Sequence, residues 1–323
     1  MYLAPEGDEI EIADAAADFL AQKMPIDRLH KPGAADMSET LRELLGEMGW
    51  FGLAVPAERG GSGLSPVEHA LFFREVGRQC GPVDLLAQAL AANAAQDTGL
   101  RQSIISGSRG VALMVADGDG YRLFGSDHAD LALIVTRERA QLHPLEQAAL
   151  ESRAALDPAN SLRVADALPD AVDGTSGETI WRLGELGAAA MLVGLAEAAL
   201  DLIVEYAKVR EAFGRPIGAY QAVRHTCADM AVRIEAARSQ LWFAAAALKE
   251  GRGDAGAHLD AAKHLANEAG MACADSNIQL HGGIGVSEEH DAHLLLKHAM
   301  LLSRLFGSKR SLLARLLEAR LED

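Results

Sequence analysis

Apolar residues recur at helical spacing through the first part of the chain, from about Ile10 to Asp97. The pattern is clearest within Leu41–Met48 and Ala70–Gly77, where apolar side chains three or four residues apart share one face of a helix. Between these stretches, the proline and glycines of Val55–Pro66 predict an irregular loop, and Ser65 followed by Pro66 is typical of the start of a helix. The sequence therefore predicts an N-terminal helical region.

The pattern changes between Gly107 and Thr179, where apolar runs become short. Val111–Val115, Tyr121–Phe124 and Leu131–Thr136 are rich in apolar and β-branched residues, which favours strands. Asp117–Gly120, with the sequence Asp-Gly-Asp-Gly between two such runs, predicts a β-hairpin. This part of the chain therefore predicts a small β domain.

Long helices are predicted again from Leu186 onward, because apolar residues form two broad helical stripes. The first stripe holds Leu192, Leu195, Ala199, Ile203 and Tyr206, and the second holds Cys227, Met230, Ile234, Ala237, Leu241 and Leu248. Glycine-rich breaks at 214–216, 251–256 and 282–285 separate three helices, and Glu289–Leu305 and Lys309–Leu321 predict a final pair. Consecutive helices with broad apolar stripes indicate a bundle.

The fold class is therefore mainly α with a small central β domain. We expect an N-terminal helical domain at 1–106, a small middle β domain at 107–182 and a C-terminal bundle of four or five helices at 183–323. The order α, β, α favours separate layers, and no GxGxxG follows a strand, which argues against a Rossmann fold.

Composition and charge narrow the function classes. A composition of 49% hydrophobic and 24% charged residues is typical of a folded globular protein, and a formal charge of −16 argues against nucleic-acid binding. The acidic N-terminus and the lack of a run of about 20 apolar residues predict a cytoplasmic protein without a membrane span. Cys80, Cys227 and Cys273 are widely spaced in apolar helical contexts, so we expect free thiols.

Three stretches, in order along nearly the whole chain, resemble the acyl-CoA dehydrogenase family. They are Met48–Pro56 with Gly60–Ser65, then Arg210–Gln221 followed by Ala228–Met230, and finally Gln279–Gly285 with Glu289 shortly after. Their joint occurrence at these separations is far more specific than any one motif. The resemblance implies a fold of N-terminal helices, a central β domain, reduced in this chain, and a C-terminal four-helix bundle. It also implies an FAD-dependent oxidoreductase of lipid metabolism that desaturates an acyl-CoA thioester between its α and β carbons.

The resemblance also implies half of a flavin site. In the family, the matching residues reach across a dimer interface to the adenosine-diphosphate part of an FAD held by the neighbouring subunit. Carried over to this chain, that half-site is Arg210, Phe213, Gln221, Gln279, Gly282 and Gly283. The chemistry is consistent, because a guanidinium pairs with pyrophosphate, glutamine amides bind ribose or adenine edges, and glycines let the backbone approach a ligand. Judged one at a time, Arg210 also fits a surface salt bridge and the glycines fit a helix end.

The chain departs from the family in two places. The middle domain is several tens of residues shorter than in the family, since Val111–Asp117 runs almost directly into Tyr121–Gly125; the missing strands carry contacts to the flavin ring. At the family's usual position for the catalytic glutamate stands Phe306, which cannot accept a proton. Some family members place the base at the start of the first bundle helix, where Gly184 matches and Glu185 is one residue away; Glu185 is the candidate base, with an acidic helix start as the alternative.

We expect no metal site. Glu288, Glu289, His290, Asp291 and His293 have metal-ligand side chains, but after Ser287 they fit an N-cap followed by an acidic first helical turn.

Three hypotheses follow. The first is a subunit of a heteromeric acyl-CoA dehydrogenase that gives its half-site to a full-length partner, in an α2β2 heterotetramer similar to bacterial steroid-degrading dehydrogenases. Its partners would be that full-length subunit, an acyl-CoA substrate and an electron-transfer flavoprotein or similar acceptor. The second is a self-sufficient homo-oligomeric enzyme that uses Glu185 as a relocated base, and the third is a non-catalytic scaffolding relative.

Overall fold

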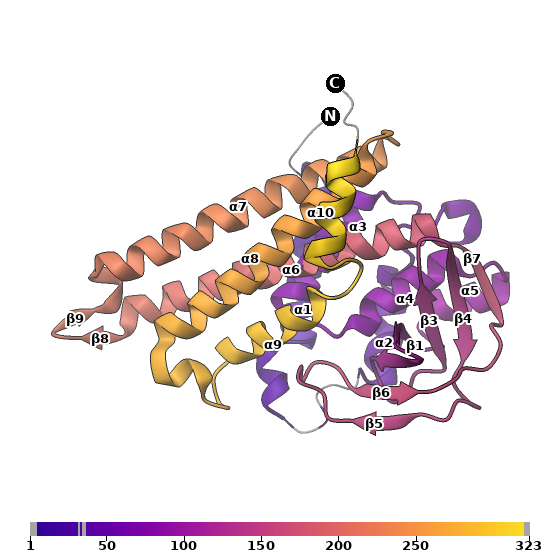
Figure 1. The fold of residues 1–323 in the computed structure, drawn as a ribbon, viewed down its shortest axis with the longest axis horizontal. Coiled ribbons are helices and arrows are strands. Elements are labelled where there is room, and N and C mark those ends of the chain that lie inside the picture. Colours follow the sequence, from indigo (N-terminus) through magenta and orange to yellow (C-terminus); the bar gives the residue numbers. More distant parts are fainter. Residues whose placement is uncertain (1–4, 32, 34–36, 320–323) are drawn as a thin grey trace. The chain divides into compact units, whose positions relative to one another are not determined.

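A computed structural model describes residues 5–31, 33 and 37–319, and it shows the predicted order of helices, sheet and helices (Figure 1). Contacts within the described chain group it into two compact units. The first, here the helical unit, comprises the chain up to His30, then Phe73–Cys80 and the chain from Glu185 onward. The second, here the sheet unit, comprises the chain between His30 and Phe73 together with Gly81–Gly184. The three domains expected from the sequence remain a prediction.

The sheet unit begins with short helices set by local signals. They are α2 (Glu39–Glu47), η2 (Trp50–Gly52), η3 (Ala57–Arg59), α4 (Val83–Ala94), α5 (Thr98–Ile105) and the first turns of α3 (Pro66–Arg78). The predicted loop and helix start are confirmed, because Pro66 opens α3 and the Ser65 backbone N–H donates to Glu68 Oε2 at 2.8 Å in a capping box. Helix α4 is buried along its whole length, so it forms the centre of this unit.

Seven strands form one sheet in the order β5-β6-β2-β1-β3-β4-β7, in which β1 and β3 are parallel and the other pairs are antiparallel. The strands are β1 (Val111–Asp117), β2 (Gly120–Phe124), β3 (Leu131–Val135), β4 (Arg139–Pro144), β5 (Glu151–Arg153), β6 (Leu162–Ala165) and β7 (Asp173–Ser176). The three predicted strands are confirmed, and so is the hairpin, where Asp117 pairs with Gly120. Alternate residues of the central strands, such as Ala112 and Met114, point into an apolar core.

The helical unit is built from long helices. They are α1 (Asp8–Lys23), η1 (Ile26–His30), the end of α3, most of α6 (Gly177–Val209), α7 (Gln221–Lys249), α8 (Ala255–His281), η5 (Gly282–Val286), α9 (Ala292–Leu302) and α10 (Lys309–Glu318). Between α6 and α7 lie the two-residue strands β8 (Glu211–Ala212) and β9 (Arg215–Pro216) and the short helix η4 (Ile217–Ala219). The predicted breaks after the first three long helices are confirmed.

The last two helices have bounds that differ from the predicted ones. Helix α9 begins at Ala292 rather than near Glu289, so the interpretation of Ser287 as its N-cap was wrong. The reason is a contact from far along the chain: the His30 ring bonds to the Glu288 carbonyl at 2.8 Å and to Asp291 Oδ1 at 2.7 Å, which holds this segment in a turn. Helix α10 ends at Glu318, and residues 320 and 321 of the predicted helix lie outside the described residues.

Helices α3 and α6 cross closely within the helical unit. Gly77 of α3 faces the backbone of Met191, and Gly194 of α6 faces the backbone of Arg74, so that a Cβ on either glycine would overlap a carbonyl group. The alanine-rich middle of α6 is fully buried beside this crossing. Small residues therefore set the separation of these two helix axes.

Helix α6 is also the one described helix that is long and apolar enough to cross a membrane. However, 72% of its apolar window is buried inside the fold, which identifies it as a core helix.

Candidate functional site

The six residues of the predicted half-site come together at one end of the helical unit. Figure 1 shows that α6 ends, α7 begins and α8 ends at this same end of the bundle. Arg210, Phe213 and Gln221 form a first arm between α6 and α7, and Gln279, Gly282 and Gly283 form a second arm at the end of α8. All six are exposed to solvent.

The first arm is a tight hairpin. Arg210 follows directly after α6, its backbone N–H donates to the Tyr206 carbonyl at 2.9 Å, and its own carbonyl accepts from the Ile217 N–H at 2.8 Å. The Tyr220 hydroxyl donates to the Ala212 carbonyl at 2.8 Å, and the Arg215 guanidinium lies 4.1 Å from the centre of the Tyr220 ring. These contacts hold a hairpin whose strands have only two residues each.

Phe213 occupies the tip of this hairpin and is 98% exposed. Its φ is +51°, and Gly214 after it has φ +80°, as in a two-residue type I′ turn. Asparagine and glycine favour such a turn, whereas an aromatic residue with positive φ is strained. An exposed, strained aromatic side chain at a loop tip is typical of a residue kept for an interaction outside its own chain.

The second arm exposes backbone rather than side chains. Gly282 ends α8 with φ +66°, and a Cβ built on Gly282 or Gly283 would meet no atom of the described chain within 4 Å. Gln279 is exposed on the last turn of α8. The two glycines therefore form an open ledge that a ligand can approach closely.

Aromatic rings join the two arms. The Tyr206 ring, one turn before Arg210, lies 4.4 Å from the His281 ring, which immediately precedes Gly282. The separation of the arms is thus set by side-chain packing within this chain.

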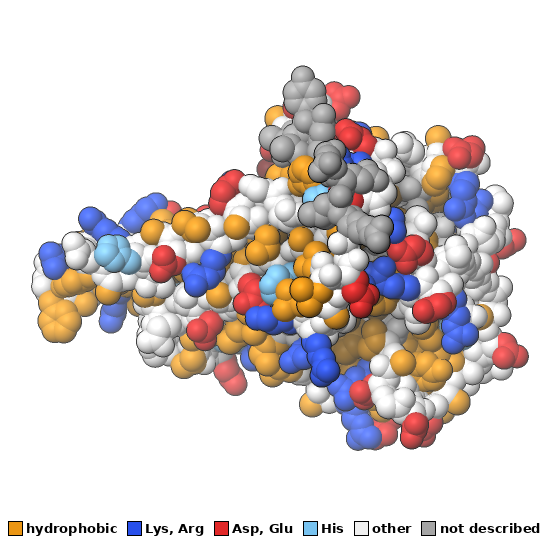
Figure 2. All heavy atoms as spheres, turned by 45° about the horizontal axis from the view of Figure 1, so that its top comes forward, with side chains coloured by type: hydrophobic (Ala, Val, Ile, Leu, Met, Phe, Trp, Pro, Cys, Tyr) orange, Lys and Arg blue, Asp and Glu red, His pale blue; other side chains and the backbone are white. Residues whose placement is uncertain are grey.

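The arrangement fits the adenosine-diphosphate end of FAD. Arg210 can pair with a pyrophosphate in fork geometry, Gln221 and Gln279 offer amides to polar edges, and the glycine ledge admits a sugar or phosphate. Figure 2 shows hydrophobic side chains at the end of the helical unit that carries the hairpin, with Lys and Arg side chains beside them. A nucleotide that has both a charged and an aromatic part suits such a surface.

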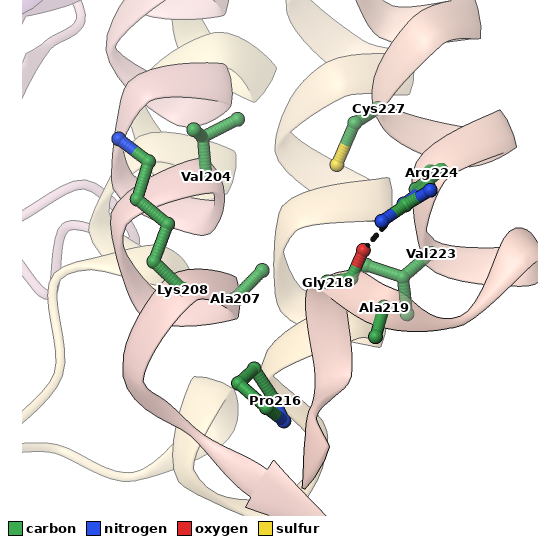
Figure 3. Close-up of a pocket in the computed structure, with 9 residues that line it drawn as sticks. All are labelled: Val204, Ala207, Lys208, Pro216, Gly218, Ala219, Val223, Arg224 and Cys227. Carbon is green, nitrogen blue, oxygen red and sulfur yellow. Dashed lines mark hydrogen bonds between the residues drawn. The ribbon is translucent and has the colours of Figure 1, made fainter.

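A groove of about 490 Å³ lies beside the hairpin, between the end of α6 and the start of α7 (Figure 3). Its lining is mostly apolar: Val204, Ala207, Lys208, Pro216, Gly218, Ala219, Val223, Arg224 and Cys227. The Arg224 guanidinium is occupied in donating to the Gly218 carbonyl at 2.7 Å. Partial burial raises the pKa of the Cys227 thiol, so it stays protonated and unreactive.

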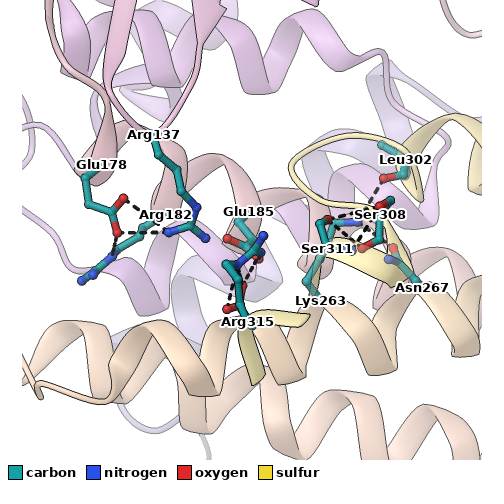
Figure 4. A network of polar contacts seen from close by, with 11 residues as sticks. Arg137, Glu178, Arg182, Glu185, Lys263, Asn267, Leu302, Ser308, Ser311 and Arg315 are labelled. Atoms are coloured by element: carbon teal, nitrogen blue, oxygen red, sulfur yellow. Dashed lines mark hydrogen bonds and ion pairs between the residues drawn. The ribbon is translucent and has the colours of Figure 1, made fainter. Parts of the chain in front are cut away.

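The second place of interest is a buried charged network among α6, α8, α9 and α10 (Figure 4). Glu185 is only 1% exposed, and one of its carboxylate oxygens lies 3.2 Å from Arg315 Nη2. The same arginine pairs with Asp260 through its Nε at 2.9 Å. Because this arginine holds Glu185 and Asp260 together inside the helical unit, the arrangement favours a structural role for Glu185. Its role as a base remains a prediction.

Lys263 belongs to the same network. It is fully buried, and its ammonium donates to Asn267 Oδ1 at 2.6 Å and to the Leu302 carbonyl at 3.2 Å. Burial lowers the pKa of Lys263 to about 7, although Glu185 nearby acts in the opposite direction. Figure 4 also shows a separate ion-pair group in the sheet unit, where Glu178 pairs with Arg137 at 3.2 Å and with Arg182 at 2.8 Å.

Phe306 is buried in the turn between α9 and α10, with a strained φ of +56°. A buried hydrocarbon ring at this position offers no group for proton transfer. The described residues also contain no cluster of three or more His, Cys, Asp or Glu able to hold a metal ion.

Sequence reasoning missed Tyr206 and His281 as links between the arms, and Lys263 and Asp260 as parts of the buried network. The only signal for Lys263 was a charged residue within an alanine-rich helical stripe, and this pattern does not reveal its partners on α9.

Comparison with known families gives two matches. Residues 6–99 match "Acyl-CoA dehydrogenase, N-terminal domain", and residues 182–321 match "Acyl-CoA dehydrogenase, C-terminal domain". The second match contains the whole half-site and the buried network.

Two relatives from Mycobacterium tuberculosis align with most of the chain. The acyl-CoA dehydrogenase IpdE2 is 34% identical over 287 residues, which cover 86% of each protein. The acyl-CoA dehydrogenase FadE34 is 33% identical over 295 residues; the match covers 85% of this chain but only 41% of FadE34.

Two solved structures share the fold. A variant of the Tcur3481–Tcur3483 steroid acyl-CoA dehydrogenase is 26% identical with a TM-score of 0.80, and the match covers 96% of this chain and 97% of that one. A chain of the ChsE4–ChsE5 complex from Mycobacterium tuberculosis is 22% identical with a TM-score of 0.80, covering 98% of both chains. The matched domains, the relatives and the fold agree, and this chain belongs to the acyl-CoA dehydrogenase family, whose members are FAD-dependent oxidoreductases acting on CH–CH bonds.

Proposed function

We propose that this chain is a subunit of a heteromeric acyl-CoA dehydrogenase that desaturates an acyl-CoA thioester between its α and β carbons. It contributes the half-site of Arg210, Phe213, Gln221, Gln279, Gly282 and Gly283 to an FAD whose reactive ring is held by a full-length partner subunit. The partner also supplies the carboxylate that removes the α-proton.

The observation that carries this proposal is the exposed end of the helical unit. The half-site presents an open glycine ledge and a 98% exposed Phe213, whose backbone strain costs stability in an isolated chain. Val209 and Val286, adjoining the two arms, are also large exposed hydrophobic residues. A surface of this kind is explained when a ligand and a second protein cover it.

The two positions considered for a catalytic base support a site that is shared between two subunits. Phe306 cannot take a proton, and Glu185 is buried against Arg315. In this arrangement the residues of the present chain bind and orient, because Arg210 neutralises the pyrophosphate and the amides fix the adenosine. The bound flavin supplies the hydride acceptor for the reaction.

The relatives support the choice of partner and substrate class. The solved relative with 26% identity is a steroid acyl-CoA dehydrogenase named by two gene products, Tcur3481 and Tcur3483. We therefore propose an α2β2 heterotetramer with a full-length acyl-CoA dehydrogenase, a steroid-derived CoA thioester as substrate, an electron-transfer flavoprotein as acceptor, and action in the cytoplasm.

The proposal is tested by producing the chain together with each full-length acyl-CoA dehydrogenase of the same organism in turn. We expect a yellow complex in which Arg210→Ala weakens FAD binding by about 10- to 100-fold, because a charge-assisted hydrogen bond contributes about 1.5–3 kcal/mol. Arg310→Ala, at an exposed arginine on α10, is the matched control and should bind FAD like the wild type. FAD affinity is measured by flavin fluorescence titration of the apo-complex.

The alternatives give different results. A chain that acts alone would purify yellow without a partner, oxidise acyl-CoA, and lose turnover in Glu185→Gln while it keeps its flavin. A scaffolding relative would show the same FAD affinity in the wild type and in Arg210→Ala. Either result would reject the proposal that the FAD site is shared between this chain and a partner subunit.

A further inference from the structure

We propose that the ring cluster Tyr206–His281–His290 is the positioning element of the half-site. With both imidazoles neutral, the cluster holds the first arm against the second, and protonation in mild acid releases the second arm. This inference rests on the proposed function, because it concerns how the same half-site is kept in its binding geometry.

The three rings pack on one another in a triangle. The His281 ring centroid is 4.4 Å from that of Tyr206 and 4.4 Å from that of His290, and Tyr206 and His290 are 6.5 Å apart. Tyr206 comes from the last turns of α6, His281 ends α8, and His290 lies in the turn before α9. The cluster thus ties together three segments that no regular backbone hydrogen bonding joins at this point.

Two of the rings are coupled directly to half-site residues, and the third is coupled to helix α9. The Tyr206 carbonyl accepts the backbone N–H of Arg210 at 2.9 Å, so a shift of Tyr206 moves the start of the first arm. His281 precedes Gly282, and its Nδ1 bonds to the Asn277 carbonyl at 2.8 Å. His290 Nδ1 accepts the Ala292 N–H at 3.1 Å, which links the cluster to the first turn of α9.

The chemistry of His281 suits the neutral form. Its side chain is buried, and among the described residues no polar atom is placed to form a hydrogen bond with Nε2. Protonation would place a second N–H and a positive charge at this buried position beside the His290 ring. Burial lowers the pKa of His281, the hydrogen bond to the Asn277 carbonyl acts in the opposite direction, and the charge of His290 lowers the pKa by a smaller amount.

The groups around His290 shift its pKa in both directions. Burial lowers the pKa of His290, Asp291 raises it, and His30 of η1 lowers it. On α9, burial and the charge of Lys297 likewise lower the pKa of His293, whose ring lies 6.4 Å from that of His30. Asp291 is already engaged with His30 Nε2 at 2.7 Å, so it cannot compensate several imidazolium charges at once.

The direction of the pH effect follows from these shifts. A histidine whose pKa is lowered in the closed cluster binds a proton more readily once the cluster opens. The closed cluster, in which the three rings are packed together, is therefore most stable when the pH is above 6.5, the ordinary pKa of histidine. It loses stability as the pH falls below that value. Acid should open η5 and the glycine ledge and weaken nucleotide binding.

The first experiment measures backbone hydrogen exchange in the isolated chain at about pH 7.5 and about pH 5.5, corrected for intrinsic exchange. We expect residues 282–286 to lose protection in acid in the wild type. His290→Phe keeps a ring in the cluster but cannot be protonated, so it should retain protection at both values. Tyr206→Ala removes the ring that α6 contributes and should lose protection at both values.

His258→Phe is the matched control. His258 also packs on an aromatic ring, with its centroid 4.4 Å from that of Phe243, but it lies in the first turns of α8, far along the helix from His281. This variant should respond to acid like the wild type. An acid response that persists unchanged in His290→Phe, or a Tyr206→Ala variant with normal protection, would overturn the proposal.

The second experiment measures FAD affinity of the complex with the full-length partner at the same two pH values. We expect the wild type to bind FAD on the order of tenfold more weakly in acid, and His290→Phe to lose most of this difference. Failure of Arg210→Ala to weaken binding at the higher pH would reject the half-site itself. Normal binding with equal acid sensitivity in wild type and His290→Phe would reject only the role of the cluster.

Discussion

Phe213 combines an exposed side chain with a strained backbone. Its side chain is 98% exposed, and its φ of +51° lies in a region that costs a non-glycine residue about 1 kcal/mol or more. The residue gains no compensating burial among the described residues of its own chain. We propose that the ring makes its contacts when the half-site is covered.

Replacing Phe213 by asparagine should therefore stabilise the isolated chain and at the same time weaken FAD binding by the complex. Phe213→Asn creates the Asn-Gly pair preferred in type I′ turns, so the free energy of unfolding should rise by about 0.5–1 kcal/mol. FAD affinity of the complex should fall at the same time. Chemical denaturation of the isolated chain and flavin titration of the complex measure the two effects. Reduced stability would show that the ring supports the hairpin itself.

Lys263 is the second residue whose behaviour follows from its surroundings. Its pKa is about 7 in the folded chain, against 10.5 for an unburied lysine, so the unfolded chain binds the extra proton between these values. The free energy of unfolding should therefore rise with pH by on the order of 5 kcal/mol across this window.

Lys263→Met tests this dependence, since methionine cannot titrate. The slope of unfolding free energy against pH should flatten in this variant, as measured by denaturant titrations at several pH values. Lys309→Met removes an exposed lysine paired with Glu268 and should keep the wild-type slope. Equal slopes in wild type and Lys263→Met would mean that Lys263 stays charged throughout.

At the scale of elements, the crossing of α3 and α6 depends on two glycines. Gly194→Val would force a side chain against the backbone of Arg74, and neither helix can move away without disturbing the buried middle of α6. We expect a loss of about 3 kcal/mol in the free energy of unfolding. Ala198→Val, on a partly exposed turn of the same helix, should cost much less. Denaturant unfolding followed by circular dichroism compares the two.

Elements with strong local signals could be predicted from the sequence. The stripes of α6, α7 and α8, the capping box at Ser65 and the hairpin at Asp117–Gly120 are each determined by neighbouring residues. The start of α9 could not be predicted, because His30 sets it from 258 positions away along the chain. For the same reason, the ion pair of Glu185 could not be predicted, because its partner Arg315 lies 130 positions away along the chain.

The candidate site was predictable only in part. The residues of the half-site came from a family resemblance, and the structure brings all six to one end of the helical unit. Their binding of FAD stays a prediction. The rings that separate the two arms carry no local pattern, because ring packing between α6 and α8 depends on tertiary structure.

At the scale of the whole molecule, the proposed half-site on this chain and the proposed ring pocket on a partner predict how many FAD molecules the complex binds. Each FAD needs one chain of each kind, so the complex should bind one FAD per pair of unlike chains, and the isolated chain should bind none stoichiometrically. Flavin absorbance against protein concentration gives this ratio. A ratio of one FAD per chain would show that both kinds of subunit hold a complete site.

The small hairpin β8–β9 has a consequence for the speed of assembly. The Tyr220 hydroxyl and the Arg215–Tyr220 contact already order it in the free chain. A partner therefore meets a preformed shape, and no slow ordering step should follow the first collision. Association should proceed as a single bimolecular phase whose rate increases in proportion to partner concentration.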